Sequence, residues 1–294
     1  MINFFKKRLK VITRSQEISR MWNKLAVHQS AEVIKYLQNL NDIELQQKIS
    51  EITFEMSNKS QITNSLEYNG ISLVKNFLNA VKCDECANDI KKIISSYSKT
   101  DAKPWKNLKV VDDGSLSYGE MSNYTETVVN IRSGDDKGMI DIFNIDKLMP
   151  SFESIKESLI QSKLLQEIFN EKDLKASNLN VYINQGITKT RGFHIDTFAK
   201  KIKFFIYLTD VNTLDDGPYC FVKKTHINTP LSNFHKEILR YPEATTDSLV
   251  LDIEDVIPVL ADRGNMIISD QSGIHRGFPQ KASGYRAVIV LSTG

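Results

Sequence analysis

The sequence predicts a mainly β chain with flanking helices, in which an antiparallel jelly-roll core follows a helical N-terminal extension. Two observations indicate this fold class. Apolar residues recur at helical spacing in the first part of the chain, whereas short apolar runs between turn residues dominate the later part. Because these late strands do not alternate with helices, the order of elements favours a jelly roll over a parallel α/β sheet.

Residues 1–64 are expected to form the helical extension. Apolar side chains recur at helical spacing across residues 16–40, and a second, shorter run lies between Leu45 and Met56. The polar stretch MSNKSQITNS marks the boundary with a second domain, residues 65–294. We expect the N-terminal helices to pack on that domain, on a protein partner or on a second copy of the chain.

The second domain is expected to begin with a short strand, ISLVKNFL, and a helix that carries Cys83 and Cys86. These cysteines follow the helical spacing of their apolar neighbours, which favours buried core thiols over a zinc or redox site. The three cysteines of the chain, the third being Cys220, are too few for a disulfide framework.

The remaining elements follow from local pattern. Residues 105–149 alternate apolar pieces with turn residues and predict hairpins and loops over one wall of the site, and a helix is expected from Pro150 to Phe169. NFHKEILR predicts a helix within an insertion between Thr225 and Val256, a candidate lid. The segments expected to be strands are LNVYIN, KIKFFIYLTDV, PYCFVKK, NMIISD and RAVIVLS.

Composition and charge describe an ordinary globular protein. Of the 294 residues, 41% are hydrophobic, and 38 basic residues against 36 acidic ones give no general reason to expect nucleic acid as a partner. No apolar run approaches the ~20 residues that cross a bilayer. The first residues, MINFFKKRLKVITR, lack the apolar core of a secretory signal, so a cytoplasmic protein is expected.

The segment RGFHID carries the chemistry. His194 and Asp196 are two residues apart, so in extended backbone both side chains lie on the same side. A second histidine, His275, lies between two glycines in the distal stretch GNMIISDQSGIHRGFP. Two histidines and one carboxylate form the facial triad that suits Fe(II) and leaves coordination positions open for other ligands. Taken alone, the His-x-Asp pair also fits a surface histidine beside a solvated aspartate.

Arg286 lies 11 residues after His275 in the last strand-like run. A strand, a turn and a return strand would set Arg286 beside the metal-facing side of His275. Alternation places Arg286, Val288 and Val290 on one face, and an arginine on such an apolar face requires a carboxylate partner. A guanidinium group suits two-pronged binding of a carboxylate.

Together, RGFHIDTFAKKIKFFIYLTDVNTLDDGPYCFVKKTH, the distal HRGFP and GYRAVIV resemble the phytanoyl-CoA dioxygenase-like family of Fe(II)/2-oxoglutarate-dependent oxygenases. The resemblance covers roughly residues 65–294. It implies a double-stranded β-helix, the cupin-like jelly roll, with His194, Asp196 and His275 as iron ligands. It also implies that Arg286 binds the far carboxylate of 2-oxoglutarate, and that O2 is the second co-substrate.

The implied reaction is hydroxylation of a small organic molecule, with release of succinate and CO2. Two alternatives stay open: a non-redox metal enzyme of the same fold, such as an isomerase or hydrolase, and an inactive barrel that acts as a binding module. Asn180 and Tyr207 are either further co-substrate contacts or ordinary strand positions. The basic residues near the motif are either a solvated face or a guide for an anionic substrate, and these are Lys189, Arg191, Lys200, Lys201 and Lys203.

Overall fold

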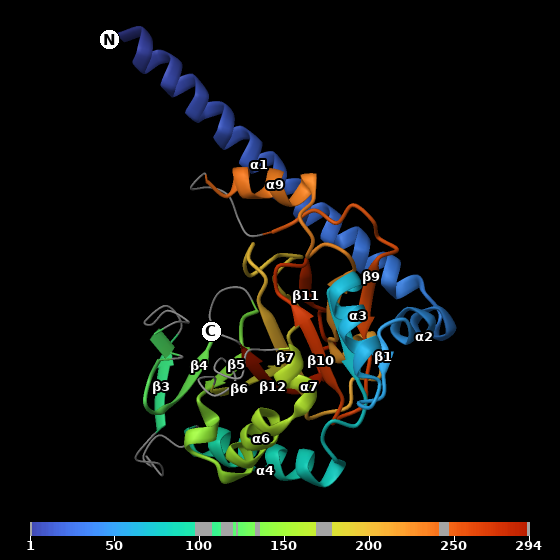
Figure 1. Cartoon of the computed structure of the whole chain (residues 1–294). Helices are drawn as coiled ribbons and strands as arrows, with labels where there is room; N and C mark the ends of the chain where they lie inside the picture. Colours follow the sequence, from blue (N-terminus) through green and yellow to red (C-terminus); the bar gives the residue numbers. More distant parts are fainter. Residues whose placement is uncertain are drawn as a thin grey trace.

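The strands of the computed structural model form two sheets that pack against each other (Figure 1). The structure describes residues 2–97, 108–112, 120–121, 123–132, 136–168, 178–240 and 247–292. Over these residues the large sheet has nine strands, in the spatial order β1 (Thr53–Phe54), β2 (Ile71–Val74), β10 (Met266–Asp270), β7 (Ile202–Tyr207), β12 (Tyr285–Ser292), β6 (Leu179–Gln185), β5 (Ile140–Phe143), β4 (Thr127–Ile131) and β3 (Leu108–Asp112).

The small sheet is formed by β11 (His275–Gly277), β8 (Tyr219–Val222) and β9 (Val256–Val259), in that order. Neighbouring strands are antiparallel except for the pairs β1–β2 and β3–β4. The mainly β prediction is therefore confirmed, including the strands around the HID segment.

Helices cover the outer face of the large sheet. The buried core on this face joins apolar strand residues to side chains of α3 (Lys59–Asn69), α4 (Ala80–Tyr97), α6 (Pro150–Gln161) and α7 (Lys163–Ile168). Cys83 and Cys86 lie fully buried in this core. The single helix predicted from Pro150 to Phe169 is broken into α6 and α7, because Ser162 adopts an extended ψ of 116°.

The inner face of the large sheet meets the small sheet. Strand alternation separates the two faces of β7: its even-numbered apolar residues pack against the helices, whereas Lys203, Phe205 and Tyr207 point inward. A second apolar core fills one end of the space between the sheets and includes Leu45 and Ile49 of α2 (Asp42–Ser50). The other end of this space is the cavity described below.

The long helix α1 (Ile2–Asn39) crosses one end of the molecule and projects beyond it (Figure 1). Near its C-terminal end, Val33 and Leu37 share a buried cluster with Phe193 and Ile195, the neighbours of His194. The second domain is thus in direct contact with residues 1–64, while the boundary at residue 64 stays a prediction.

The predicted helix in the 225–256 insertion is α9 (Pro230–Ile238), and it lies beside α1. The indole of Trp22 stacks on His235 with ring centroids 5.2 Å apart. No residue of α9 lines the main cavity, so the helix packs on α1 instead of covering the cavity. Within the described residues, no helix is long and apolar enough to cross a membrane.

Candidate metal site

One antiparallel residue pair places two histidines side by side. The backbone N–H of His194 donates to the carbonyl of His275, and the N–H of His275 donates back to the carbonyl of His194, both at 2.9 Å. His275 begins β11, whereas His194 lies in the segment that leads into β7. Two parts of the chain that are distant in sequence therefore present their imidazoles to the same place.

Hydrogen bonds to the backbone fix which ring nitrogen of each histidine is unprotonated. Nδ1 of His194 lies 2.7 Å from the carbonyl oxygen of Gly192, and Nδ1 of His275 lies 2.9 Å from that of Gly273. Because a carbonyl oxygen can only accept, each Nδ1 carries the proton and each Nε2 keeps its lone pair. A backbone acceptor on the second nitrogen is how proteins hold a metal-binding histidine in its tautomer and orientation.

Asp196 completes the donor set. Its Oδ1 lies 3.8 Å from Nε2 of each histidine, and the three donor atoms lie within 4.8 Å of one another. Two imidazole nitrogens and one carboxylate oxygen are a set that suits Fe(II) and leaves positions open for other ligands, although zinc also accepts these donors. The residues present thus fit a divalent metal ion.

The protonation states of the three side chains also fit a metal ion. Burial lowers the pKa of both histidines, and for His194 the neighbouring His275 and Arg191 add to the effect, so both rings are neutral at neutral pH. Burial alone would raise the pKa of Asp196, but the neighbouring basic groups, Lys203 foremost among them, together outweigh burial and hold that pKa below its usual range. Neutral imidazole and ionised carboxylate are the forms that bind metal.

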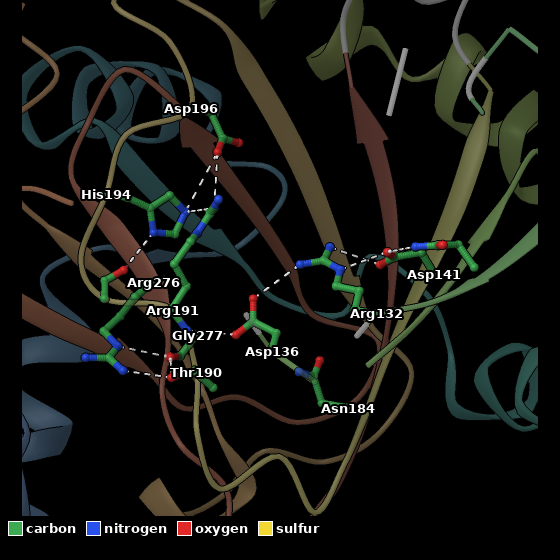
Figure 2. A network of polar contacts seen from close by, with 12 residues as sticks. Arg132, Asp136, Asp141, Asn184, Thr190, Arg191, His194, Asp196, Arg276 and Gly277 are labelled. Carbon is green, nitrogen blue, oxygen red and sulfur yellow. Dashed lines mark hydrogen bonds and ion pairs between the residues drawn. The ribbon is translucent and has the colours of Figure 1, made fainter. Parts of the chain in front are cut away.

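Two cations flank the carboxylate of Asp196. The Nζ of Lys203 donates to Oδ2 at 2.6 Å, and Nη2 of Arg191 lies 3.6 Å from Oδ1 and contacts Nε2 of His194. Figure 2 shows the guanidinium of Arg191 beside both His194 and Asp196. Lys203 points inward from β7 and its side chain is only 13% exposed. Both residues are basic neighbours of the motif in sequence, but their contact with Asp196 depends on how the loop folds back onto β7.

A cavity of about 670 Å³ adjoins the three donors. Inward-facing side chains of β4, β5, β6, β7 and β12 line it on the large sheet, and Tyr219 and His275 line it on the small sheet. Its volume lies within the range of about 300–1,000 Å³ that is typical of small-molecule sites.

Arg286 reaches this cavity as a buried charge without a carboxylate partner. Its Nη2 donates to Oδ1 of Asn184 at 2.9 Å, and its Nη1 donates to the carbonyl of Gly217. Its Nε is buried without a hydrogen-bond partner, and no acid among the described residues lies within ion-pair distance. Burial lowers the pKa of this guanidinium, although the group stays charged.

The position of Arg286 relative to the metal donors follows from Gly277. A Cβ built on Gly277 would lie 3.6 Å from Nη2 of Arg286. Gly277 is two residues after His275 on β11, a step of about 6.6 Å in extended backbone. The guanidinium therefore lies one two-residue step away from the second histidine, on the same side of the strand.

A second arginine on the cavity wall, Arg132, was not singled out from the sequence. Its Nε and Nη2 donate to the two carboxylate oxygens of Asp141 at 2.8 and 3.1 Å, and its Nη1 donates to Asp136 at 3.2 Å. Asp136 also accepts from the backbone N–H of Arg191 at 2.9 Å (Figure 2). Charged residues thus connect the wall predicted from residues 105–149 to the segment that carries His194 and Asp196. The signal for them in the sequence was their alternation along the hairpin.

Asn180 and Tyr207 differ in their relation to the cavity. Oδ1 of Asn180 accepts from the backbone N–H of Asn144 at 3.1 Å, and Asn180 is not among the residues that line the cavity. Tyr207 lines it, while its hydroxyl donates to the carbonyl of Val259 at 3.1 Å and accepts from the N–H of Tyr219 at 3.2 Å. Burial raises the pKa of Tyr207 to about 12, so the hydroxyl keeps its proton. Roles for both residues in co-substrate binding stay predictions.

No protein-family model matches the sequence, and no curated protein sequence matches it. Among solved structures, HygX from Streptomyces hygroscopicus, with nickel, 2-oxoglutarate and hygromycin B bound, is similar over 79% of this chain and 85% of its own, at 11% identity and a TM-score of 0.49.

The epimerase SnoN from nogalamycin biosynthesis, in complex with Fe3+, alpha ketoglutarate and nogalamycin RO, is similar over 80% and 83% of the two chains, at 11% identity and a TM-score of 0.49. AviO1 from Streptomyces viridochromogenes Tue57 is similar over 80% and 94%, at 13% identity and a TM-score of 0.48. Likenesses this distant say nothing about the chemistry of this chain.

Proposed function

We propose that this chain is an Fe(II)- and 2-oxoglutarate-dependent oxygenase that hydroxylates a small organic molecule and releases succinate and CO2. The fold would be the double-stranded β-helix of the phytanoyl-CoA dioxygenase-like family that the sequence resembles. His194, Asp196 and His275 would hold the metal, and Arg286 would hold the far carboxylate of 2-oxoglutarate. Bound iron would supply the oxidative chemistry with O2, and the chain would supply binding, orientation and a partly dry site.

The single observation that carries this proposal is the state of Arg286. A buried guanidinium whose only partners among the described residues are an amide oxygen and a backbone carbonyl keeps an unbalanced positive charge. Burial of such a charge is costly unless an anion balances it. Because the guanidinium lies a two-residue step from His275, a five-carbon diacid is long enough to reach from Arg286 to the metal donors.

The other residues of the site have supporting roles in this proposal. Asn184 and Gly217 hold the guanidinium fork of Arg286 in one orientation, so that little rotational freedom is lost when the carboxylate binds. Tyr207 lines the cavity and would contact the co-substrate directly, whereas Asn180 does not line the cavity and would have to act indirectly. Residues 1–64, which are mostly helical, would support the site, since Val33 and Leu37 share a buried cluster with Phe193.

A non-redox metal enzyme with the same donors is the main alternative. Such an isomerase or hydrolase needs the metal but has no stated need for a second, buried cation a short step from it. An inactive barrel needs neither the unprotonated Nε2 atoms of the two histidines nor the charge of Arg286. Neither alternative therefore explains why a positive charge is buried at Arg286.

Succinate formation tests the proposal directly. The full chain is incubated with Fe(II), 2-oxoglutarate and a panel of small molecules, and succinate is measured with and without O2. We expect succinate that requires Fe(II), 2-oxoglutarate and O2 and that disappears in His275→Ala. Succinate formation equal in parent and His275→Ala protein would contradict the assignment, and zinc-dependent turnover without O2 would favour the non-redox alternative.

A further inference from the structure

The metal end of the cavity holds more positive side chains than its single carboxylate can balance. Lys203 lies 2.6 Å from Oδ2 of Asp196, and Arg191 lies 3.6 Å from Oδ1. Lys201, two residues before Lys203 on the inward side of the same segment, also lines the cavity. Among the residues that the structure describes, Asp196 is the one acid within ion-pair distance of Lys203 or Arg191.

The proposed metal and co-substrate, on which this inference rests, increase the imbalance. A divalent ion would share Asp196 with the two cations that already contact it. Of the two carboxylates of 2-oxoglutarate, one would be balanced at Arg286, so only the other would reach the metal end. Three side-chain cations and a divalent ion would then face one aspartate and one co-substrate carboxylate, and an excess of charge that is partly shielded from solvent favours a further anion.

The other cationic wall of the cavity shows that such an excess is not a general property of this chain. There, Arg132 is matched by Asp141 and Asp136 within hydrogen-bond distance. Arg286, by contrast, has no described acid within ion-pair distance, so the positive excess is found at the metal end and at the proposed co-substrate site but not at Arg132.

The register of β12 separates this cationic group from the co-substrate site. Arg286 pairs with Asn184 at one end of the strand, whereas Ser292, at the other end, pairs with Lys203. Six residues of extended strand span about 20 Å, so the backbones of Arg286 and Lys203 lie far apart and their side chains approach the metal donors from different parts of the large sheet. A cavity of about 670 Å³ has room for a substrate beside the co-substrate.

We propose that Lys201, Lys203 and Arg191 form a subsite that binds an anionic group of the substrate, a carboxylate or a phosphate, next to the metal. The subsite would orient the rest of the substrate toward the open coordination positions, and the charge would draw the substrate into the cavity. The substrate class is thus a small organic anion.

Anion binding to the loaded protein tests this subsite. The full chain is loaded anaerobically with Fe(II) and 2-oxoglutarate, and inorganic phosphate or acetate is titrated by calorimetry while the visible absorbance of the iron–2-oxoglutarate complex is followed. Lys201→Gln is the main variant, because Lys201 contacts none of the proposed metal ligands, and Lys203→Gln is the second. Lys200→Gln is the matched control, since Lys200 is exposed and does not line the cavity.

We expect saturable binding of at least one of the two anions, weakened at least about tenfold in Lys201→Gln and Lys203→Gln, because each variant removes a charge-assisted hydrogen bond. Lys200→Gln should bind like the parent. Equal binding in the parent and Lys201→Gln is expected for an anion held by iron alone, and it would overturn the subsite. Binding that is lost equally in Lys200→Gln would overturn it too. In either case the visible absorbance shows whether the proposed function stands. Absence of the absorbance itself overturns the proposed function and this inference together.

Discussion

Two of the arginines that line the cavity, Arg132 and Arg286, differ in charge balance, because among the described residues two acids pair with Arg132 and none pairs with Arg286. Arg132 donates three hydrogen bonds to Asp141 and Asp136, whereas Arg286 donates to a carbonyl and an amide oxygen. Neutral acceptors hold a guanidinium in place without cancelling its charge. The comparison indicates that Arg132 stabilises the cavity wall and that Arg286 is positioned to bind an anion that is not part of the chain.

The largest effect on 2-oxoglutarate affinity is expected from replacing Arg286, the arginine without an acid partner among the described residues. Arg286→Ala should weaken 2-oxoglutarate binding at least about 100-fold, because hydrogen bonds to a charged group contribute about 1.5–3 kcal/mol each. The midpoint temperature of thermal unfolding without co-substrate should not fall, since the variant removes an unbalanced buried charge. Calorimetric titration of the metal-loaded protein measures the affinity, and Arg286→Lys, which keeps the charge but loses the fork, should lie between parent and Ala.

An unchanged affinity for 2-oxoglutarate in Arg286→Ala would remove the contrast between the two arginines. A large loss of stability in the same variant would show that Arg286 serves the fold, as Arg132 does.

The paired arginine should behave in the opposite way. Asp141→Asn is expected to lower the free energy of unfolding by about 2–3 kcal/mol, below the roughly 3–5 kcal/mol of a fully buried pair, because the side chain of Arg132 is 25% exposed. Affinity for 2-oxoglutarate should change little. Chemical denaturation measures the stability, with Asp84→Asn as the control, since Asp84 pairs with Arg263 on the surface and its loss should cost less than about 1 kcal/mol.

Equal stability of Asp141→Asn and Asp84→Asn would mean that the Arg132 pair does not hold the wall. A strong loss of 2-oxoglutarate affinity in Asp141→Asn would instead give Arg132 a part in co-substrate binding.

The smallest effect is expected at Tyr207, whose hydroxyl already has two partners in the chain. Tyr207→Phe should weaken 2-oxoglutarate binding by no more than about tenfold and cost about 1 kcal/mol of stability, the size of one ordinary hydrogen bond. The same calorimetric and denaturation measurements apply. A loss of affinity as large as that of Arg286→Ala would make Tyr207 a principal contact of the co-substrate.

The sequence predicted the parts of the site that depend on local pattern. The two-residue spacing of His194 and Asp196, the isolated His275 and the alternation that turns Arg286 inward are all properties of single strands or turns. The structure brings these four residues to one cavity. The strands predicted around the HID segment are present for the same reason, since alternation is visible within a few residues.

What the sequence did not reveal depends on contacts between distant segments. The partners of Arg132, the position of Lys203 against Asp196 and the packing of α1 behind Phe193 all require the folded arrangement of strands and loops. Nor does a periodic pattern show that Ser162 interrupts a helix, because an extended ψ at one residue leaves the spacing of apolar residues intact.

The central claim is that His194, Asp196 and His275 bind Fe(II) that in turn binds 2-oxoglutarate. Anaerobic difference absorbance tests it most directly, with Fe(II) and 2-oxoglutarate added separately and together to the parent, to His194→Ala, to His275→Ala and to His28→Ala, whose side chain is exposed. We predict a visible band that requires both additions, saturates at one iron per chain, persists in His28→Ala and is absent from the other two variants. A parent protein without this band, or a band of equal strength in His275→Ala, would contradict the account.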